Sequence, residues 1–574
     1  MVAWSDVLLW RAAHIETVQD DASAARKAAR EHVRELEVYY SRIASQGLAI
    51  DAMRQALSRV QDELDHAVNA ISAYMLACAE AIDGVRVVEA KVRSALEISE
   101  EIGCTIHDDG SVSIPYIDLS DAVRYGKADV LLGKYSDLRM CIAAALSVAR
   151  KVDEELRRKL QELAEDKFEQ NGPKEGRHSA SPGLPDDADE SWSPSEVSAW
   201  WAALTDEERQ ACIERDPLKY GNLDGIDMAS RDKANRMALY GYDTGGNASI
   251  RLGSTGLLQQ AQDKFDQAQA AYDDCVGAHG EDSDEAKALK AERDRAERDL
   301  KDLQKIDERL RKGAGKDGEP VSLLALDTSG EQVKAAVAVG DVDHAQHVAN
   351  FTPGMGTNVR DSLDNYVDVA DRMRDNTADK VGIGKSDVAV VAWLNYDAPT
   401  DVTKTWDLDV ASTEKAHAGA DRLAGFLTGV RSWRDEQGGS LHLTSVSHSY
   451  GSTTAGLAMR QMGEGVVDDH VYLASPGSGA YSVGALGVDP SHVWVSAVPE
   501  GDMVQGMGPD GTFGRDPQEL EGIQHLSGDA TGAQGYDPQP SSPVANHSSY
   551  FAPPKPGEEN EAFNDVCRVV GGAK

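Results

Sequence analysis

This 574-residue chain has no long apolar run and comparatively few basic residues. A membrane-spanning helix needs about 18 or more consecutive apolar residues, so the missing run argues against one. Lys and Arg number 58 against 97 Asp and Glu, which leaves a formal net charge of −39. Such an acidic chain repels nucleic acid and anionic membrane surfaces. We therefore expect neither as a partner and attribute the acidity to solubility.

Cysteine is also sparse. The six cysteines lie far apart and form no C-x-x-C pair, which excludes a local zinc knuckle or dithiol redox motif and provides no disulfide framework. The N-terminus, MVAWSDVLLW, lacks the basic start and small-residue cleavage site of a secretory signal. We expect a cytoplasmic protein with reduced thiols, and export without a classical signal peptide is the alternative.

Proline and glycine are nearly absent between about residues 4 and 103, where apolar residues recur at spacings of three and four. Ser45-Gln46-Gly47 interrupts this pattern and predicts a turn between two helices. A further helical pattern covers 118–166, so we expect a helical bundle over residues 1–168. The bundle loosely resembles the helical hairpins of type VII secretion substrates, which implies a protein partner for it.

Residues 169–194 are rich in Pro, Gly, Ser and charge, a composition typical of a flexible linker. After it come GNLDG at 221–225 and RDKANR at 231–236. We interpret residues 195–256 as a helical segment that docks on a larger domain. Residues 257–312 predict a charged helical hairpin, which is either a partner-binding arm or a self-packed hairpin beside the catalytic domain.

From residue 313 to 574, β-branched apolar runs alternate with helical patterns. This alternation predicts an α/β fold with a mostly parallel sheet covered on both faces. Ligands bind at the carboxyl ends of the strands in such sheets, so residues that follow strands are informative. The expected strands are 321–326, 335–339, 349–352, 388–394, 441–447, 470–474 and 493–497.

The run that begins at Leu441 leads into Ser447-His448-Ser449-Tyr450-Gly451, and small residues then open a helix. A strand, a sharp turn and a helix with serine at the apex resemble the nucleophile elbow, G-x-S-x-G. The apex is strained, so the positions two before and two after it must be small. Gly451 keeps this rule, whereas Ser447 replaces the first glycine. We predict Ser449 as a nucleophile.

A carboxylate and a histidine follow in the order expected for this fold. Asp502 comes after the strand at 493–497, and His547 lies near the end of the domain. The rival acids are Glu500 and Asp489, and the main rival base is His525. We expect His448 to point away from the nucleophile.

The glycine loop Pro353-Gly354-Met355-Gly356 ends a strand two strands before the elbow. Small residues there let the backbone approach a substrate carbonyl. We predict the N–H groups of Met355 and Tyr450 as the oxyanion hole. The resulting scheme requires no metal and no cofactor.

These motifs also resemble, in order, an actinobacterial α/β-hydrolase family long catalogued as a domain of unknown function. The resemblance covers about 195–256 and 315–570 and rests on AVGD at 338–341, PGMG at 353–356, WLNYDAP at 393–399, HSYGS at 448–452 and HSSYF at 547–551. It implies a serine hydrolase with Ser449, Asp502 and His547 as its triad.

We expect a carboxylic-ester hydrolase that acts on a small-molecule or lipid ester. The alternative is a non-catalytic interaction protein with a vestigial hydrolase fold, linked to type VII secretion.

Overall fold

The computed structural model describes residues 2–42, 48–114, 128–165, 187–189, 191–241, 255–315, 318–399 and 413–574. Their contacts divide the chain into two compact units, one within Met1–Ile117 and Leu138–Gln210 and the other within Asp118–Asp137 and Ala211–Lys574. Among these described residues, no helix combines the length and apolarity needed to cross a membrane. The predicted turn at 45–47 and most of the predicted linker lie outside the described residues.

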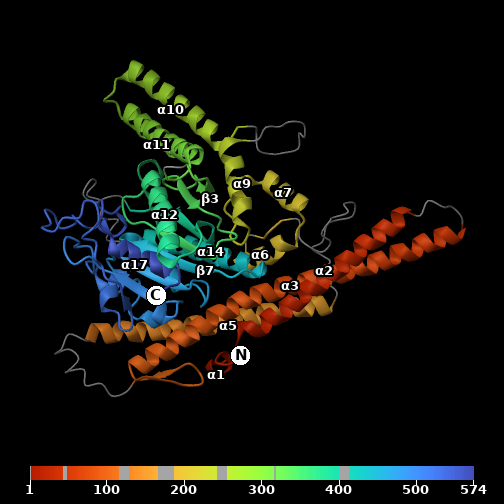
Figure 1. The fold of residues 1–574 in the computed structure, drawn as a ribbon. Coiled ribbons are helices and arrows are strands. Elements are labelled where there is room, and N and C mark those ends of the chain that lie inside the picture. The colour runs from red at the N-terminus through yellow and green to blue at the C-terminus, as the bar shows by residue number, and fades with distance from the viewer. Residues whose placement is uncertain are drawn as a thin grey trace. The chain divides into compact units, whose positions relative to one another are not determined.

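The first unit is helical, as the sequence predicts (Figure 1). Its elements are α1 (Trp4–Val7), α2 (Ala12–Arg42), α3 (Leu48–Glu101), a short hairpin of β1 (Thr105–Ile106) and β2 (Val112–Ser113), most of α5 (Ala128–Ala164), and α6 (Pro194–Ala203). Gly84 allows α3 and α5 to approach closely, because a Cβ there would lie 2.1 Å from Val152 Cγ2. The likeness to type VII substrates stays a prediction.

Helix α6 belongs to this first unit, which differs from our expectation that all of 195–256 docks on the α/β domain. The Ser195 backbone N–H and hydroxyl both donate to the Asp83 carboxylate on α3. Lys159 on α5 donates to the Glu196 carboxylate at 2.9 Å. These partners lie 112 and 37 residues away in the chain, so local sequence patterns do not reveal them.

The later part of that segment, residues 211–241, lies in the second unit. Helix α7 (Asp206–Arg215) spans the division, and α8 (Pro217–Tyr220) and α9 (Met228–Tyr240) follow. Side chains of the GNLDG and RDKANR motifs bond the backbone of the edge strand β3 (Val321–Asp327). The donors and acceptors are Asn222 with both the N–H and C=O of Leu326, Asn235 and Asp232 with Leu323, Arg231 with Leu324, and Arg236 with Val321.

This arrangement works as a side-chain substitute for a neighbouring strand. Edge strands present unpaired N–H and C=O groups, and covering them prevents pairing with another chain. The two motifs are therefore structural: they close one edge of the sheet.

The charged hairpin consists of α10 (Leu257–His279) and α11 (Asp284–Lys312), with a Ser283 side chain capping the second helix. Helix α11 packs on α12 (Val359–Val381). Arg309, 1 % exposed, donates to Asp364 and Asp368 on α12 at 2.9 and 3.0 Å. These contacts agree with a self-packed hairpin beside the α/β domain.

The sheet has eight strands in the order β10-β9-β8-β7-β5-β6-β4-β3. The remaining strands are β4 (Lys334–Val339), β5 (His347–Thr352), β6 (Val388–Leu394), β7 (His442–His448), β8 (Asp469–Leu473), β9 (Val493–Ser496) and β10 (Gln524–His525). Strands β6, β5 and β7 to β10 run parallel, and among the described strands of this sheet only the pairs β3–β4 and β4–β6 are antiparallel. This α/β-hydrolase sheet, mostly parallel, confirms the predicted fold class.

Two pairs of helices cover the sheet. Helix α12 packs with α17 (Glu561–Val570), and both contribute to the large apolar core on one side of the strands. Helices α14 (Glu414–Glu436) and α15 (Tyr450–Met459) pack together on the other strand face. Short elements fill the loops at α16 (Asp510–Phe513), η2 (Lys385–Asp387), η4 (Val483–Ala485), η5 (Pro490–His492), η6 (Pro517–Glu519) and η7 (Ser549–Phe551).

Candidate active site

Ser449 stands between β7 and α15 in a strained backbone conformation. Its φ of 56° and ψ of −135° lie in a region that residues other than glycine rarely adopt. The chain turns so sharply there that Gly451 presses on the neighbouring loop. A Cβ on Gly451 would lie 2.2 Å from the Pro353 carbonyl oxygen, closer than atoms can approach. The turn has the geometry of a nucleophile elbow.

Ser447 fits where glycine is usual because its hydroxyl has a partner. The residue is fully buried, and its Oγ donates to the Val471 carbonyl of β8 at 3.0 Å. A buried hydroxyl without a partner would cost about 1–3 kcal/mol. The substitution therefore leaves the elbow intact.

Ser449, His547 and Asp502 come together as a hydrogen-bonded chain. The Ser449 Oγ lies 3.0 Å from His547 Nε2, and His547 Nδ1 lies 2.8 Å from Asp502 Oδ1. The Asp502 side chain is fully buried, whereas that of His547 is 19 % exposed. An ionised carboxylate only accepts hydrogen bonds, so the imidazole proton belongs on Nδ1 and Nε2 is left to accept from the serine.

The pKa of Asp502 is lowered despite its burial. Burial raises the pKa of this carboxyl, but the hydrogen bond and charge of His547 and the hydrogen bonds from Tyr550 and Gln505 lower it by more. The carboxylate is therefore ionised near neutral pH. It can hold the imidazole orientation and stabilise an imidazolium.

The glycine loop meets the elbow at the serine. A Cβ on Gly354 would lie 2.5 Å from Ser449 Cβ and 2.9 Å from its Oγ. The Tyr396 hydroxyl donates to the Pro353 carbonyl at 2.7 Å, which anchors the loop. Met355 follows Gly354 directly and Tyr450 is the first residue of α15, so both backbones lie beside Ser449. Their role as oxyanion donors stays a prediction.

Among the described residues, the hydrogen bonds that build the triad involve none of the rivals, and Asp489 has another partner. His525 lies in β10, three strands from β7 in the sheet order, and a spacing of about 4.8 Å per strand places it roughly 14 Å away. The Asp489 carboxylate accepts from the Ser491 N–H and caps η5. The Glu500 side chain is exposed, and its backbone carbonyl accepts from Asn546.

His448, which we expect to point away from the nucleophile, lies against the base. Its Nε2 is 2.7 Å from the His547 carbonyl oxygen, and the two rings are 4.6 Å apart between centroids. Burial, followed by the nearby His547, lowers the pKa of His448 to about 3. This imidazole is neutral, so Nε2 carries the proton and donates it to the carbonyl.

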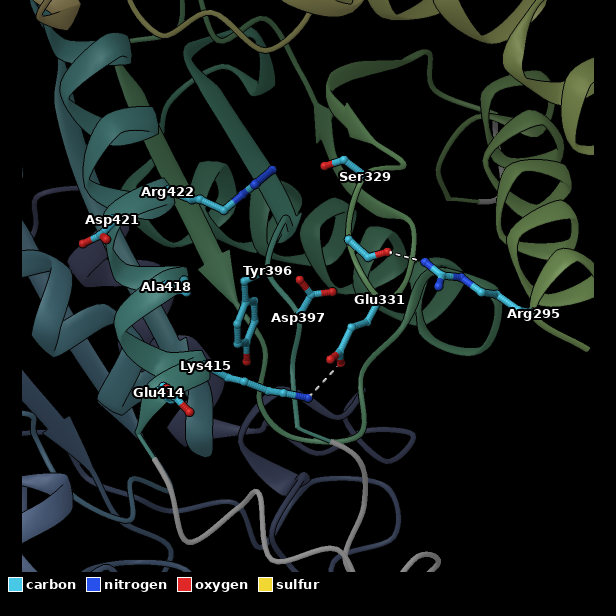
Figure 2. Close-up of a pocket in the computed structure, with 12 residues that line it drawn as sticks. Arg295, Ser329, Glu331, Tyr396, Asp397, Glu414, Lys415, Ala418, Asp421 and Arg422 are labelled. Carbon is cyan, nitrogen blue, oxygen red and sulfur yellow. Dashed lines mark hydrogen bonds and ion pairs between the residues drawn. The ribbon is translucent and has the colours of Figure 1, made fainter. Parts of the chain in front are cut away.

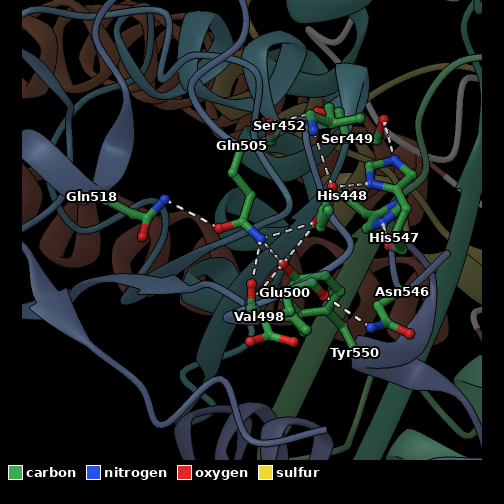
Figure 3. Close-up of polar contacts among 12 residues, drawn as sticks. His448, Ser449, Ser452, Val498, Glu500, Gln505, Gln518, Asn546, His547 and Tyr550 are labelled. Atoms are coloured by element: carbon green, nitrogen blue, oxygen red, sulfur yellow. Dashed lines mark hydrogen bonds and ion pairs between the residues drawn. The ribbon is translucent and has the colours of Figure 1, made fainter. Parts of the chain in front are cut away.

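Tyr550 and Gln505 join this site although the sequence pattern did not single them out (Figure 3). Tyr550 is three residues after His547, and Gln505 is three residues after Asp502. The sequence therefore places one polar side chain three residues after the base and another three residues after the acid. That these two side chains meet can be recognised only when the fold brings the two loops together.

A cavity of about 750 Å³ opens at the carboxyl end of β6 (Figure 2). Its lining carries both signs of charge, with Glu331 paired to Lys415 at 3.2 Å and Arg295 donating to the Gly330 carbonyl. Tyr396 is the link to the elbow, because it lines the cavity and anchors the Pro353 carbonyl.

Comparisons with known proteins agree with this fold. The sequence profile of a family described as alpha/beta hydrolase matches residues 328–510. An uncharacterized protein of Mycobacterium tuberculosis is 31 % identical over 308 residues, which cover 53 % of this chain and 42 % of that protein. This chain thus spans about two fifths of the length of that relative.

A shorter uncharacterized protein, found in Mycobacterium bovis and in Mycobacterium tuberculosis, is 35 % identical over 216 residues. The match covers 36 % of this chain and 76 % of that protein. The crystal structure of dienelactone hydrolase from Anabaena variabilis matches with 16 % identity and a TM-score of 0.21, over 35 % of this chain and 80 % of that one. From the match to the shorter mycobacterial protein and the profile match, the chain belongs to this α/β-hydrolase family.

Proposed function

We propose that the protein is a serine hydrolase that cleaves carboxylic esters. The observation that carries the proposal is the pair of contacts at 3.0 and 2.8 Å that joins Ser449 Oγ to His547 and His547 to Asp502. A strained serine, an imidazole and a buried carboxylate in this order form the machinery of nucleophilic acyl transfer.

The reaction proceeds in two halves. His547 Nε2 accepts the Ser449 proton while Oγ bonds to the acyl carbon, and the N–H groups of Met355 and Tyr450 hold the resulting oxyanion. His547 then gives the proton to the departing alcohol, and an acyl-enzyme remains. Water attacks the acyl-enzyme in the second half, with His547 again taking and returning a proton, which releases the acid and restores Ser449.

The surroundings of the triad favour an apolar acyl group. Met503, Met507 and Val544 are 59, 63 and 50 % exposed, and they lie on the loops that carry Asp502 and His547. The Met503 N–H donates to the Pro543 carbonyl at 2.9 Å, which joins these two loops. Large exposed apolar side chains on these two loops suit a small-molecule or lipid ester.

The nucleophile is tested with a fluorophosphonate probe and p-nitrophenyl acetate. We expect the wild-type protein to be labelled and to hydrolyse the ester, and Ser449→Ala to do neither. Ser386→Ala is the matched control. This exposed serine lies just before β6, at the amino end of the strand, whereas the triad lies at the carboxyl ends of the strands. Equal labelling of Ser449→Ala and wild type would refute the assignment.

A further inference from the structure

The second oxygen of the Asp502 carboxylate has its own set of donors. While Oδ1 faces His547, Oδ2 accepts from the Tyr550 hydroxyl at 2.9 Å and from Gln505 Nε2 at 3.2 Å. The Val504 N–H adds a contact to Oδ1 at 3.2 Å. Tyr550 is fully buried, so water does not compete for its hydroxyl.

The direction of the Tyr550 hydroxyl proton follows from its neighbours. A phenol oxygen has one proton to donate and lone pairs that accept. The Val498 N–H and Gln505 Nε2 both donate to this oxygen, at 2.9 and 2.8 Å. The single hydroxyl proton must therefore point to Asp502 Oδ2.

The orientation of the Gln505 amide is fixed in the same way. Its nitrogen faces the Val498 carbonyl at 2.9 Å, which can only accept, and its oxygen accepts from Gln518 Nε2 at 3.1 Å. Figure 3 shows Gln505 between Gln518 and the Tyr550 hydroxyl. An inverted amide would place oxygen against oxygen at Val498, so one N–H of Gln505 points to that carbonyl and the other is shared between the Tyr550 hydroxyl and the Asp502 carboxylate.

We propose that Tyr550 and Gln505 are positioning residues that hold the Asp502 carboxylate in register with His547 during catalysis. The inference rests on the proposed serine hydrolase function. Tyr550 stands three residues after the base and bonds the Val498 N–H just after β9, the strand that leads into the acid. One hydroxyl thus ties the loop of the base to the loop of the acid.

The donors also set how strongly the carboxylate binds the imidazolium. Two hydrogen bonds on Oδ2 spread the negative charge of the carboxylate. They keep the carboxylate ionised, so the proton stays on His547, and they limit how strongly the carboxylate stabilises the imidazolium. Burial and then the charge of Asp502 raise the pKa of Tyr550 well above its ordinary value, so the phenol keeps its proton and remains a donor.

Tyr550→Phe is the direct test, because it keeps the ring and removes only the hydroxyl. On p-nitrophenyl acetate we expect kcat/KM to fall about 10- to 100-fold, mostly in kcat, as when a supporting hydrogen bond behind a functional residue is lost. The acidic limb of the pH profile should move to higher pH, because a less solvated carboxylate stabilises the imidazolium more. Tyr536→Phe removes a partly buried phenol outside this network and is the matched control.

A second variant keeps the proposal testable if Tyr550→Phe fails to fold. Gln505→Met keeps the side-chain length and removes the amide, and we expect a smaller loss of kcat with the same direction of shift in the acidic limb. Failure of the wild type to hydrolyse any ester or to label would refute the proposed function itself. An active wild type whose Tyr550→Phe and Gln505→Met variants keep an unmoved acidic limb, even with a lowered melting temperature, would overturn this inference alone.

Discussion

Replacing Asn235 by alanine tests the side-chain edge of the sheet. Asn235 is fully buried, and its Nδ2 donates to the Gly221 carbonyl at 2.7 Å and to the Leu323 carbonyl of β3 at 3.0 Å. The substitution removes both bonds and leaves two carbonyl groups without this donor. It also opens a small void between α9 and β3.

The expected loss of stability follows from these two bonds. Each hydrogen bond contributes about 0.5–1.5 kcal/mol net, and a buried group left unpaired costs about 1–3 kcal/mol. We therefore expect the free energy of unfolding of the second unit to fall by about 2–4 kcal/mol. For a unit of this size, with an unfolding entropy of about 2.1 cal/mol/K per residue, that corresponds to a decrease in Tm of roughly 2–5 °C.

Scanning calorimetry is the appropriate assay, because a chain with two units need not melt in a single transition. Light scattering at the transition should also rise, since exposed edge groups of β3 become available to other chains. Lys233→Ala is the matched control, as Lys233 is an exposed neighbour on the same helix. A change below about 0.5 kcal/mol in Asn235→Ala, or an equal loss in Lys233→Ala, would refute the edge argument.

Three further predictions concern the elbow and its histidines. Gly354→Ala should lower kcat/KM for p-nitrophenyl acetate by about 100-fold by displacing Ser449; unchanged turnover would show that the loop yields without moving the serine. Ser447→Gly should keep kcat/KM within about threefold and lower the unfolding free energy by about 1 kcal/mol through one lost hydrogen bond; a larger kinetic loss would contradict this. Burial lowers the pKa values of His448 and His470 to about 3, so below pH 6.5 these two histidines bind more protons in the unfolded chain than in the folded one, whereas burial raises the pKa values of Asp302 and Asp343 to about 6, so these two carboxyls do the reverse below pH 6. Urea titrations should therefore show stability falling between pH 7 and 6, by up to about 1.4 kcal/mol per pH unit and histidine, and levelling off below pH 6 where the two carboxyls offset the histidines; a stability that does not fall between pH 7 and 6 would contradict this.

The hydrolase fold could be predicted because its signals are local. Apolar strands, the small residues after Ser449 and the order of Asp502 and His547 along the chain each appear within short stretches. These features specify which residues follow strands, and a parallel sheet brings strand ends together.

What escaped prediction depends on contacts distant in sequence. Helix α6 belongs with the bundle through Asp83 and Lys159. The two-residue strand β10 has too few residues for a periodic pattern. Among the donors behind Asp502, Tyr550 lies 45 residues from Gln505 and 48 residues from Asp502, and a single tyrosine or glutamine in a loop carries no signal of its role.

The strained backbone of Ser449 has a consequence for the stability of the whole domain. A residue other than glycine in such a region costs of order 1–3 kcal/mol, a sizeable part of the 5–15 kcal/mol that separates typical folded and unfolded proteins. The close contacts of Gly354 and Gly451 with their neighbours hold the serine in that conformation. The elbow is thus a point where the domain gives up stability, and glycine at position 449 would relieve that strain while removing the hydroxyl.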